Sequence, residues 1–170
     1  MLDISSLTNK QIYLKSSPKD KLLEDNFEFK NSKVKNLDQN EVLVEVVYIS
    51  IDAANRAWMQ GRTYRSQILP GDVMGGYALG KVIATNNNSF NIGDYVEGDL
   101  GWQNYAIRDA KELIKTSIKA SENLHMSVLG ITGKTAYFGL GLADLKKGET
   151  VLISAAAGAV GNVAGQIAKI

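Results

Sequence analysis

Residues 151–170 constrain the fold more than any other stretch of this 170-residue chain. Val151–Ile153 is a short apolar run of the kind that forms a fully buried parallel strand. Small residues follow it, and apolar side chains then recur at helical spacing from Val160 to Ala168. A strand, a tight glycine-bearing turn and a helix together open a βαβ nucleotide-binding unit. The sequence therefore predicts that a parallel α/β domain begins here.

The turn that runs from Ala156 to Gly161 matches the phosphate-binding pattern G-x-G-x-x-G, except that Ala156 replaces the first glycine. A pyrophosphate needs small residues because it approaches the backbone closely. The first turn of a helix also offers it unpaired N–H groups and a partial positive charge. We therefore expect the amides of Ala159, Val160 and Gly161 to face the phosphates, and Gly165 to let the helix pack close to the sheet.

Two other structures fit the same stretch. Val151–Ala168 contains no charged residue, and Gly161–Gly165 matches the G-x-x-x-G pattern of membrane helix pairs. A membrane span, however, needs about 20 predominantly apolar residues, and glycines and polar side chains such as Asn162 interrupt this stretch. The second alternative is a generic packing turn in an α/β sheet, because one glycine pattern is a weak signal. The acidic residue that usually confirms the pattern would lie beyond Ile170.

Composition places the chain among ordinary globular proteins. Hydrophobic residues make up 45% of it and charged residues 22%, and a formal net charge of +1 gives no basic surface for nucleic acid. The chain has no cysteine, which excludes a disulfide framework and a thiolate metal site. Its first residues hold no apolar core of signal-peptide length. These features predict a cytoplasmic protein that binds neither nucleic acid nor membrane.

Short strands separated by turns are predicted along most of the chain. Each of these segments alternates apolar and polar residues and is bounded by turn-forming residues, and Gly80 is expected to mark a bulge or a close approach. Closely spaced short strands of this kind predict a small antiparallel barrel or sandwich. The predicted strands are Gln11–Lys15, Asn26–Val34, Val42–Ile49, Tyr77–Ala84, Tyr95–Gly98, Gly101–Ile107 and Glu112–Lys115.

A short helix is predicted within Ser50–Met59, directly after the strongest of these strands. Here β-branched residues give way to Ala, Arg and Met, and Asp52 is suited to cap the helix. Arg56 lies four residues beyond Asp52 and is expected to pack over it. Further along, Asp94 follows a turn-rich connector and is expected to be a turn acid.

The residue pattern changes near Ser121, where helical spacing replaces alternation. Glu122–Leu129 and Thr132–Ala143 are predicted to be helices, and a turn then leads to Val151. The second helix is expected to face inward at Ala136, Leu140 and Ala143. The domain boundary is expected between residues 115 and 125. Residues 1–120 would form an all-β N-terminal domain. Residues 121–170 would hold linker helices and the first β-turn-α of an incomplete dinucleotide-binding domain.

Two further motifs carry little chemistry. Gly133-Lys134-Thr135 resembles the end of a Walker A loop, but Val128 stands where that motif needs its first glycine and no strand precedes the loop. His125 is the single histidine of the chain, and a zinc site needs three or four ligands. We therefore expect no metal site and a packed or partly exposed His125. The residue patterns identify no catalytic residue.

Four segments occur together in a characteristic order and spacing. They are Ser50–Met59, Asp99–Ile107, Gly130–Leu140 and Ala155–Gly161, and the last fits the turn A-x-x-G-x-V-G without mismatch. In these segments the chain resembles the medium-chain dehydrogenase/reductase superfamily. The resemblance is to its zinc-independent branch of NADP-dependent alkenal/one double-bond reductases, which includes prostaglandin, leukotriene and curcumin reductases. It extends over nearly the whole chain, which corresponds to the N-terminal half of a typical member.

The resemblance implies a GroES-like, partly open β-barrel followed by the start of a Rossmann domain, a doubly wound parallel sheet that is truncated here. It implies NADPH as cofactor, a hydride delivered to the β-carbon of an α,β-unsaturated aldehyde or ketone, and protonation of the enolate. The absence of cysteine agrees with a zinc-free member. The full-length protein would then be a possible homodimer, and this half alone would be inactive. A quinone oxidoreductase of the same superfamily is the alternative enzyme, and a stand-alone β-module with a binding or structural role is the alternative from another class.

The resemblance also implies a set of cofactor-binding residues. They are Gly158, Ala159, Val160, Gly161, Thr135, Ala54 and Asn55. The first four would hold the pyrophosphate, Thr135 would touch the cofactor near the nicotinamide ribose, and the last two would border the nicotinamide and the substrate. Many members have Asp-Pro-Tyr-Met-Arg where this chain has Asp52–Arg56, so the tyrosine hydroxyl of that motif is missing at Ala54.

Overall fold

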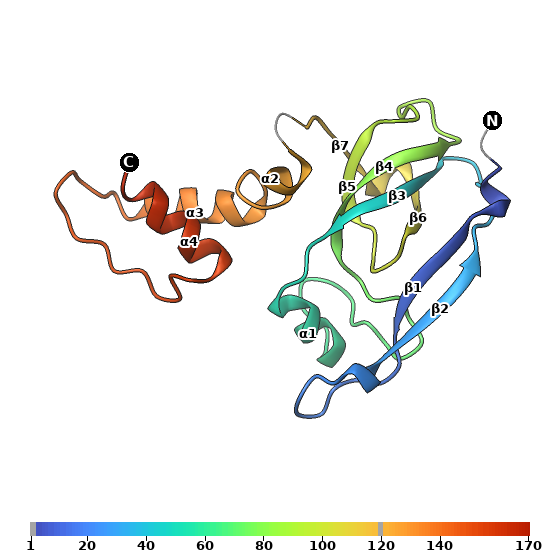
Figure 1. Ribbon diagram of the computed structural model, residues 1–170, viewed down its shortest axis with the longest axis horizontal. Coiled ribbons are helices and arrows are strands. Elements are labelled where there is room, and N and C mark those ends of the chain that lie inside the picture. Colours follow the sequence, from blue (N-terminus) through green and yellow to red (C-terminus); the bar gives the residue numbers. More distant parts are fainter. Residues whose placement is uncertain (1–2, 119–120) are drawn as a thin grey trace. The chain divides into compact units, whose positions relative to one another are not determined.

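The computed structural model describes residues 3–118 and 121–170, and the chain divides into two compact units, residues 1–117 and 118–170 (Figure 1). Among the described residues, the first unit contains the strands and one α-helix, and the second contains three α-helices. The strands are β1 Thr8–Leu14, β2 Phe27–Lys33, β3 Glu41–Ile49, β4 Tyr77–Thr85, β5 Tyr95–Asp99, β6 Tyr105–Asp109 and β7 Ile114–Thr116. The α-helices are α1 Ala53–Gln60, α2 Glu122–Met126, α3 Ile131–Leu142 and α4 Ala159–Ile167.

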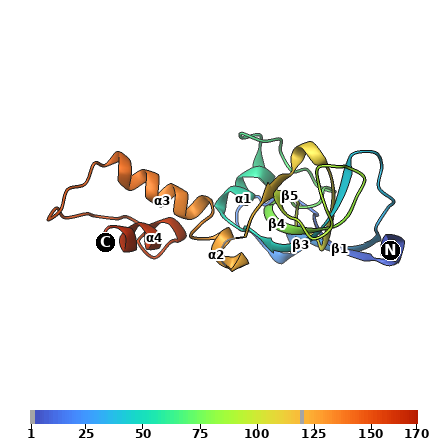
Figure 2. The ribbon, with the colours of Figure 1, turned by 90° about the horizontal axis from the view of Figure 1, so that it is seen from above.

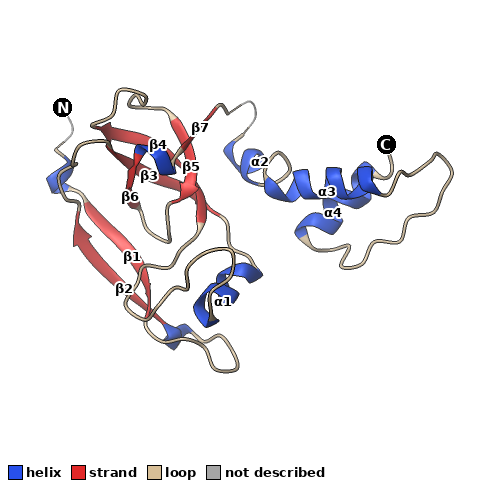
Figure 3. Ribbon diagram, turned by 180° about the vertical axis from the view of Figure 1, so that it is seen from behind, coloured by secondary structure: helices blue, strands red, loops and turns tan. Residues whose placement is uncertain are grey.

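Two antiparallel sheets build the first unit, and Figure 3 shows their strands in red. β1 and β2 form one sheet, and the other has five strands in the order β6-β3-β4-β5-β7. All strand pairs are antiparallel, as short strands joined by turns allow. The prediction of an antiparallel β N-terminal part is therefore confirmed. The expected strand at Gly101–Ile107 begins later, because β6 starts at Tyr105.

The contact between β3 and β4 is tight at Gly80. A Cβ atom at this position would lie 2.3 Å from Cγ1 of Val44 and 2.7 Å from the carbonyl oxygen of Glu45. The β3–β4 register also shifts beside it, between Val46 and Tyr48. The predicted bulge or close approach at Gly80 is confirmed, and only a residue without a side chain fits there.

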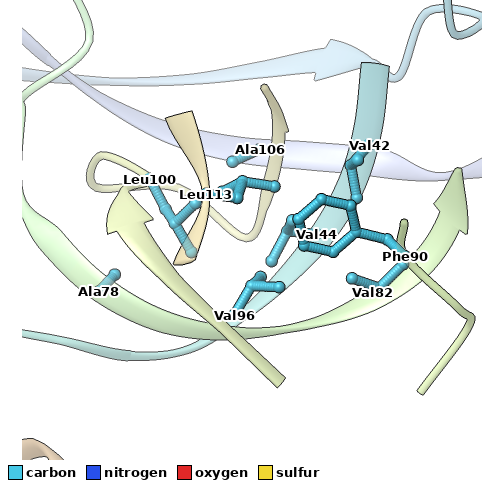
Figure 4. Packing of buried hydrophobic residues seen from close by; sticks show 9 residues of the cluster. All are labelled: Val42, Val44, Ala78, Val82, Phe90, Val96, Leu100, Ala106 and Leu113. Atoms are coloured by element: carbon cyan, nitrogen blue, oxygen red, sulfur yellow. The ribbon is translucent and has the colours of Figure 1, made fainter. Parts of the chain in front are cut away.

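The core of the larger sheet consists of aliphatic side chains and one phenylalanine. Figure 4 shows these side chains converging from β3, β4, β5, β6 and the connecting loops. Along β5 the buried residues alternate with more exposed ones, as expected when one face of a sheet is buried. β3 and β4, which lie inside the sheet, are instead buried at three consecutive positions each, 42–44 and 78–80. The cluster comprises Val42, Val44, Ala78, Val82, Phe90, Val96, Leu100, Ala106 and Leu113.

A second apolar cluster fixes α1 to the rest of the first unit. Trp58 and Met59 of α1 pack with Leu14 of β1 and with Ile68 and Met74 of the loop between α1 and β4. All of these side chains are buried. The cluster therefore holds α1 and its following loop in a defined position.

In the second unit, α3 and α4 run alongside each other (Figures 1 and 2). Ala136 of α3 and Ala164 of α4 are buried, whereas Ala143, which was expected to face inward, is exposed. The prediction of a parallel strand at Val151–Ile153 is wrong for the described residues, which contain no parallel sheet. A strand forms only by hydrogen bonding to a neighbour, and no described segment pairs with this one. Leu152 is accordingly 97% exposed.

None of the helices within residues 3–118 and 121–170 is long and apolar enough to cross a lipid bilayer.

Asp94 closes the turn between β4 and β5, as predicted. Its carboxyl should make the stability of the fold depend on pH in the acid range. Its Oδ2 accepts the N–H of Asn91 at 2.7 Å and pairs with Nζ of Lys115 at 2.6 Å. These two donors, Lys115 first, lower the pKa of the carboxyl below its ordinary value. The ionised carboxylate of Asp94 therefore stabilises the fold above the ordinary carboxyl pKa, and this stabilisation is lost as the pH falls through the lowered pKa.

We expect Asp94→Asn to be less stable than wild type at neutral pH, and the difference in stability to shrink as the pH falls below the ordinary carboxyl pKa. Urea denaturation at neutral pH and at such an acid pH measures this. A stability difference that is the same at both values would contradict the assignment.

Candidate functional site

The start of α1 is set by reciprocal hydrogen bonds just after β3. Oδ1 of Asp52 accepts the N–H of Ala54 at 2.7 Å, and Oδ1 of Asn55 accepts the N–H of Asp52 at 2.7 Å. This arrangement confirms the predicted helix and its cap. The prediction that Arg56 packs over Asp52 is wrong. The Arg56 guanidinium instead donates a hydrogen bond to the carbonyl of Asp20.

Asn55 joins α1 to the segment that enters β4. Its side chain is only 3% exposed, and Nδ2 donates to the carbonyl oxygen of Gly75 at 3.1 Å. Both ends of the amide are therefore bonded to the protein itself. Ala54 beside it is half-buried and packs against the cluster around Trp58. This geometry lets Asn55 act by positioning the backbone, and its contact with a cofactor stays a prediction.

An ion pair holds the same segment from the other side. Oδ1 of Asp99 accepts the N–H of Gly76 at 2.8 Å, and Oδ2 lies 2.7 Å from Nη2 of Arg65. The Arg65 guanidinium also lies over the ring of Trp58, 4.5 Å from its centroid. The backbone at Gly75 passes so close that a Cβ atom there would lie 2.6 Å from this guanidinium. Arg65 and Asp99 therefore tie α1, its following loop and β5 together.

We expect Arg65→Lys to lower the free energy of unfolding by about 1 kcal/mol, because lysine keeps the charge but loses the planar contact with Trp58 and the paired geometry. Urea denaturation at low salt measures the effect. Lys35→Arg is the matched control, since Lys35 pairs with Asp38 and Glu41 on an exposed surface. Equal effects of the two substitutions would show that the Trp58 contact contributes nothing.

In the second unit, a tight turn precedes α4. The N–H of Gly158 donates to the carbonyl of Ala155 at 2.8 Å, and Ala155 adopts a positive φ of 49°. Ala159, Val160 and Gly161 form the first turn of α4, where N–H groups have no acceptor within the helix. A Cβ atom at Gly161 would lie 2.4 Å from the carbonyl oxygen of Ala155. The turn therefore packs so closely against the start of α4 that only glycine fits at position 161, and the amides at the start of the helix are suited to an anion.

The expected site residues fall into two groups. Ala54 and Asn55 lie together in the first unit, whereas Gly158–Gly161 and Thr135 belong to the second. Thr135 is on α3, where its Oγ1 donates to the carbonyl of Ile131 at 2.7 Å. Sequence patterns missed Arg65 and Asp99, because their pairing depends on a contact between distant loops and no local spacing signals it.

Within the described part of the chain, no three His, Cys, Asp or Glu side chains gather into a set that could hold a metal ion. His125 is half-buried in α2.

Comparisons with known proteins define the class of this chain. Residues 10–116 match the family described as the N-terminal domain of oxidoreductase. The chain therefore belongs to this oxidoreductase family, within the medium-chain dehydrogenase/reductase superfamily.

Its relatives include named reductases. The chain is 38% identical to prostaglandin reductase 1 of Mus musculus over 150 residues, which are 85% of this chain and 44% of that protein. It is 33% identical to the NADPH-dependent curcumin reductase of Escherichia coli (strain K12) over 165 residues, which are 95% of this chain and 48% of that protein. The chain thus spans about half the length of the curated relatives it matches.

A solved structure shares the fold. CurA from Vibrio vulnificus matches with a TM-score of 0.83 and 36% identity, covering 95% of this chain and 48% of that one. The same protein in complex with NADPH matches with a TM-score of 0.83 and 35% identity.

Proposed function

We propose that this chain is the N-terminal half of a zinc-free, NADPH-dependent oxidoreductase that reduces the C=C bond of α,β-unsaturated aldehydes or ketones. The observation that carries the proposal is the match to CurA over 95% of the chain at 36% identity. Relatives named as curcumin reductase and 2-alkenal reductase support the same class of reaction. In this proposal residues 1–120 form the substrate-side domain, and residues 121–170 begin the dinucleotide-binding domain.

The turn before α4 supports the cofactor part of the proposal. Gly158, Ala159, Val160 and Gly161 would hold the pyrophosphate through backbone amides and the positive end of α4. The closely packed backbone at Gly161 supports this role, because a side chain there would clash with the carbonyl of Ala155 and displace the turn that holds the amides in place. Thr135 would border the nicotinamide ribose. NADPH, when bound, would supply the hydride.

In this proposal the first unit positions the nicotinamide and the substrate and supplies no metal. Ala54 and Asn55 would border the nicotinamide and the substrate, with the start of α1 fixed by Asp52 and by the bond from Asn55 to Gly75. A reduction without a metal depends on holding the reacting groups in a productive geometry. The capped and buried start of α1 is suited to that task. We assign no proton donor.

The test is NADPH consumption by the full-length protein with a 2-alkenal, an enone and a quinone, each with and without a metal chelator. Chelator-insensitive turnover of the alkenal or the enone is expected. Preferential turnover of the quinone would assign the chain to a quinone oxidoreductase instead. A folded protein that binds NADPH but reduces none of them would overturn the reaction while leaving the fold in place. The 170-residue chain alone is expected to be inactive.

A further inference from the structure

In the hairpin of β1 and β2, one edge makes backbone hydrogen bonds to neighbouring loops and the other edge pairs with no strand of the described residues. On its inner side, β1 bonds to two loops: the N–H of Ile12 donates to Trp102 at 2.9 Å, and the N–H of Leu14 donates to Asp72 at 2.9 Å. β2 pairs with β1 along its whole length but with no other strand of the described residues. β2 therefore forms the outer edge of the sheet in the first unit (Figures 1 and 3).

The hydrogen-bonding direction along β2 follows from its two ends. The N–H of Lys15 donates to the carbonyl of Asn26, and the N–H of Val34 donates to the carbonyl of Leu7. In an antiparallel pair, residues alternate between bonding to the partner strand and pointing away from it. The backbone groups of even-numbered residues of β2 therefore bond to β1. Those of the odd-numbered residues Phe27, Phe29, Asn31 and Lys33 point to the open edge.

The middle of this edge has one exposed apolar side chain between two oppositely charged ones. Phe29 is 80% exposed, although large aromatic side chains are usually buried. Glu28 and Lys30 flank it, pair with each other at 3.0 Å and are about half exposed. An open strand edge with an exposed aromatic centre is a template for another strand.

We propose that this edge binds a second copy of the chain, with β2 pairing antiparallel to β2 around Phe29. In this register Phe29 faces the same residue of the second copy, and Phe27 pairs with Asn31, so the outward backbone groups of these three residues are bonded. Glu28 then lies opposite Lys30 of the second copy, and Lys30 lies opposite Glu28. The two-fold symmetry therefore makes the charges self-complementary.

The alternative register centred on Lys30 is disfavoured. It would place Lys30 directly against Lys30 of the second copy, and like charges opposite each other destabilise a strand pair. A short strand pair buries little area, so the dimer is expected to be weak, in roughly the micromolar to millimolar range. This inference does not depend on the proposed reductase activity.

Charge reversal and its rescue test the proposal. Sedimentation velocity from about 10 μM to about 1 mM should show a reversible dimer of the wild-type chain. Glu28→Lys or Lys30→Glu alone places like charges at both symmetric contacts and should weaken the dimer roughly tenfold. The double variant E28K/K30E restores opposite charges and should recover the affinity of the wild type.

Lys21→Glu is the matched control, because it changes the net charge as much as Lys30→Glu but lies in the exposed loop before β2. Circular dichroism establishes that each variant is folded, and the two single variants serve as independent probes. A wild-type chain that stays monomeric at about 1 mM would overturn the proposal. So would a dimer that the single reversals leave intact or that the double variant does not recover, because its interface then lies elsewhere.

Discussion

Gly161→Ala is expected to weaken NADPH binding to the full-length protein by about thirtyfold or more. The added Cβ atom would lie 2.4 Å from the carbonyl oxygen of Ala155 and 2.9 Å from Cα of Ala156. Both are backbone atoms, so the turn itself must move, and the amides of the first turn of α4 move with it. Losing charge-assisted hydrogen bonds to a phosphate costs about 2 kcal/mol or more, which corresponds to that factor.

Gly165→Ala is the control in the same helix. Its Cβ atom would meet only Cδ1 of Ile153, at an ordinary contact distance of 3.9 Å. Alanine is also a better helix former than glycine by roughly 0.5–1 kcal/mol, so α4 should become slightly more stable. Fluorescence titration with NADPH separates the two variants. Equal affinities for Gly161→Ala and Gly165→Ala would remove the turn from the cofactor site.

Local sequence patterns were sufficient for most of the antiparallel fold. The alternation in Glu41–Ile49 and the turn residues around it specify a strand without reference to distant residues, and the structure contains β3 there. Val151–Ile153 shows the limit of such patterns. Its apolar run is compatible with a buried parallel strand, but a strand also needs a neighbour, and the described residues supply none.

The candidate site was predictable to the extent that it is local. Asp52 caps α1 through bonds within a few residues, and the cap was readable from residue types alone. The pairing of Arg65 with Asp99 joins residues that are distant in the chain, so no spacing rule identifies it. The same holds for the bond from Asn55 to Gly75, which makes Asn55 a buried connector between α1 and the segment before β4.

Asn55→Ala is expected to destabilise the first unit by about 2–4 kcal/mol, because two backbone groups lose their partners at about 1–3 kcal/mol each. These groups are the N–H of Asp52 and the carbonyl of Gly75. Asn55→Asp separates the two bonds: its carboxylate still accepts from Asp52 but cannot donate to Gly75. It should therefore be at least as unstable as Asn55→Ala, since a buried charge then faces a carbonyl oxygen.

Arg56→Ala is the neighbouring control, because Arg56 is exposed and its guanidinium bonds only to the carbonyl of Asp20 in the part of the chain that the structure describes. Its loss should cost well under 1 kcal/mol, as is usual for exposed side chains. In the proposed full-length reductase, Asn55→Ala should raise KM for NADPH and lower kcat together, because the whole start of α1 shifts when Asn55 no longer positions it. An Asn55→Ala variant as stable as Arg56→Ala would mean that the buried amide does not hold α1 to Gly75.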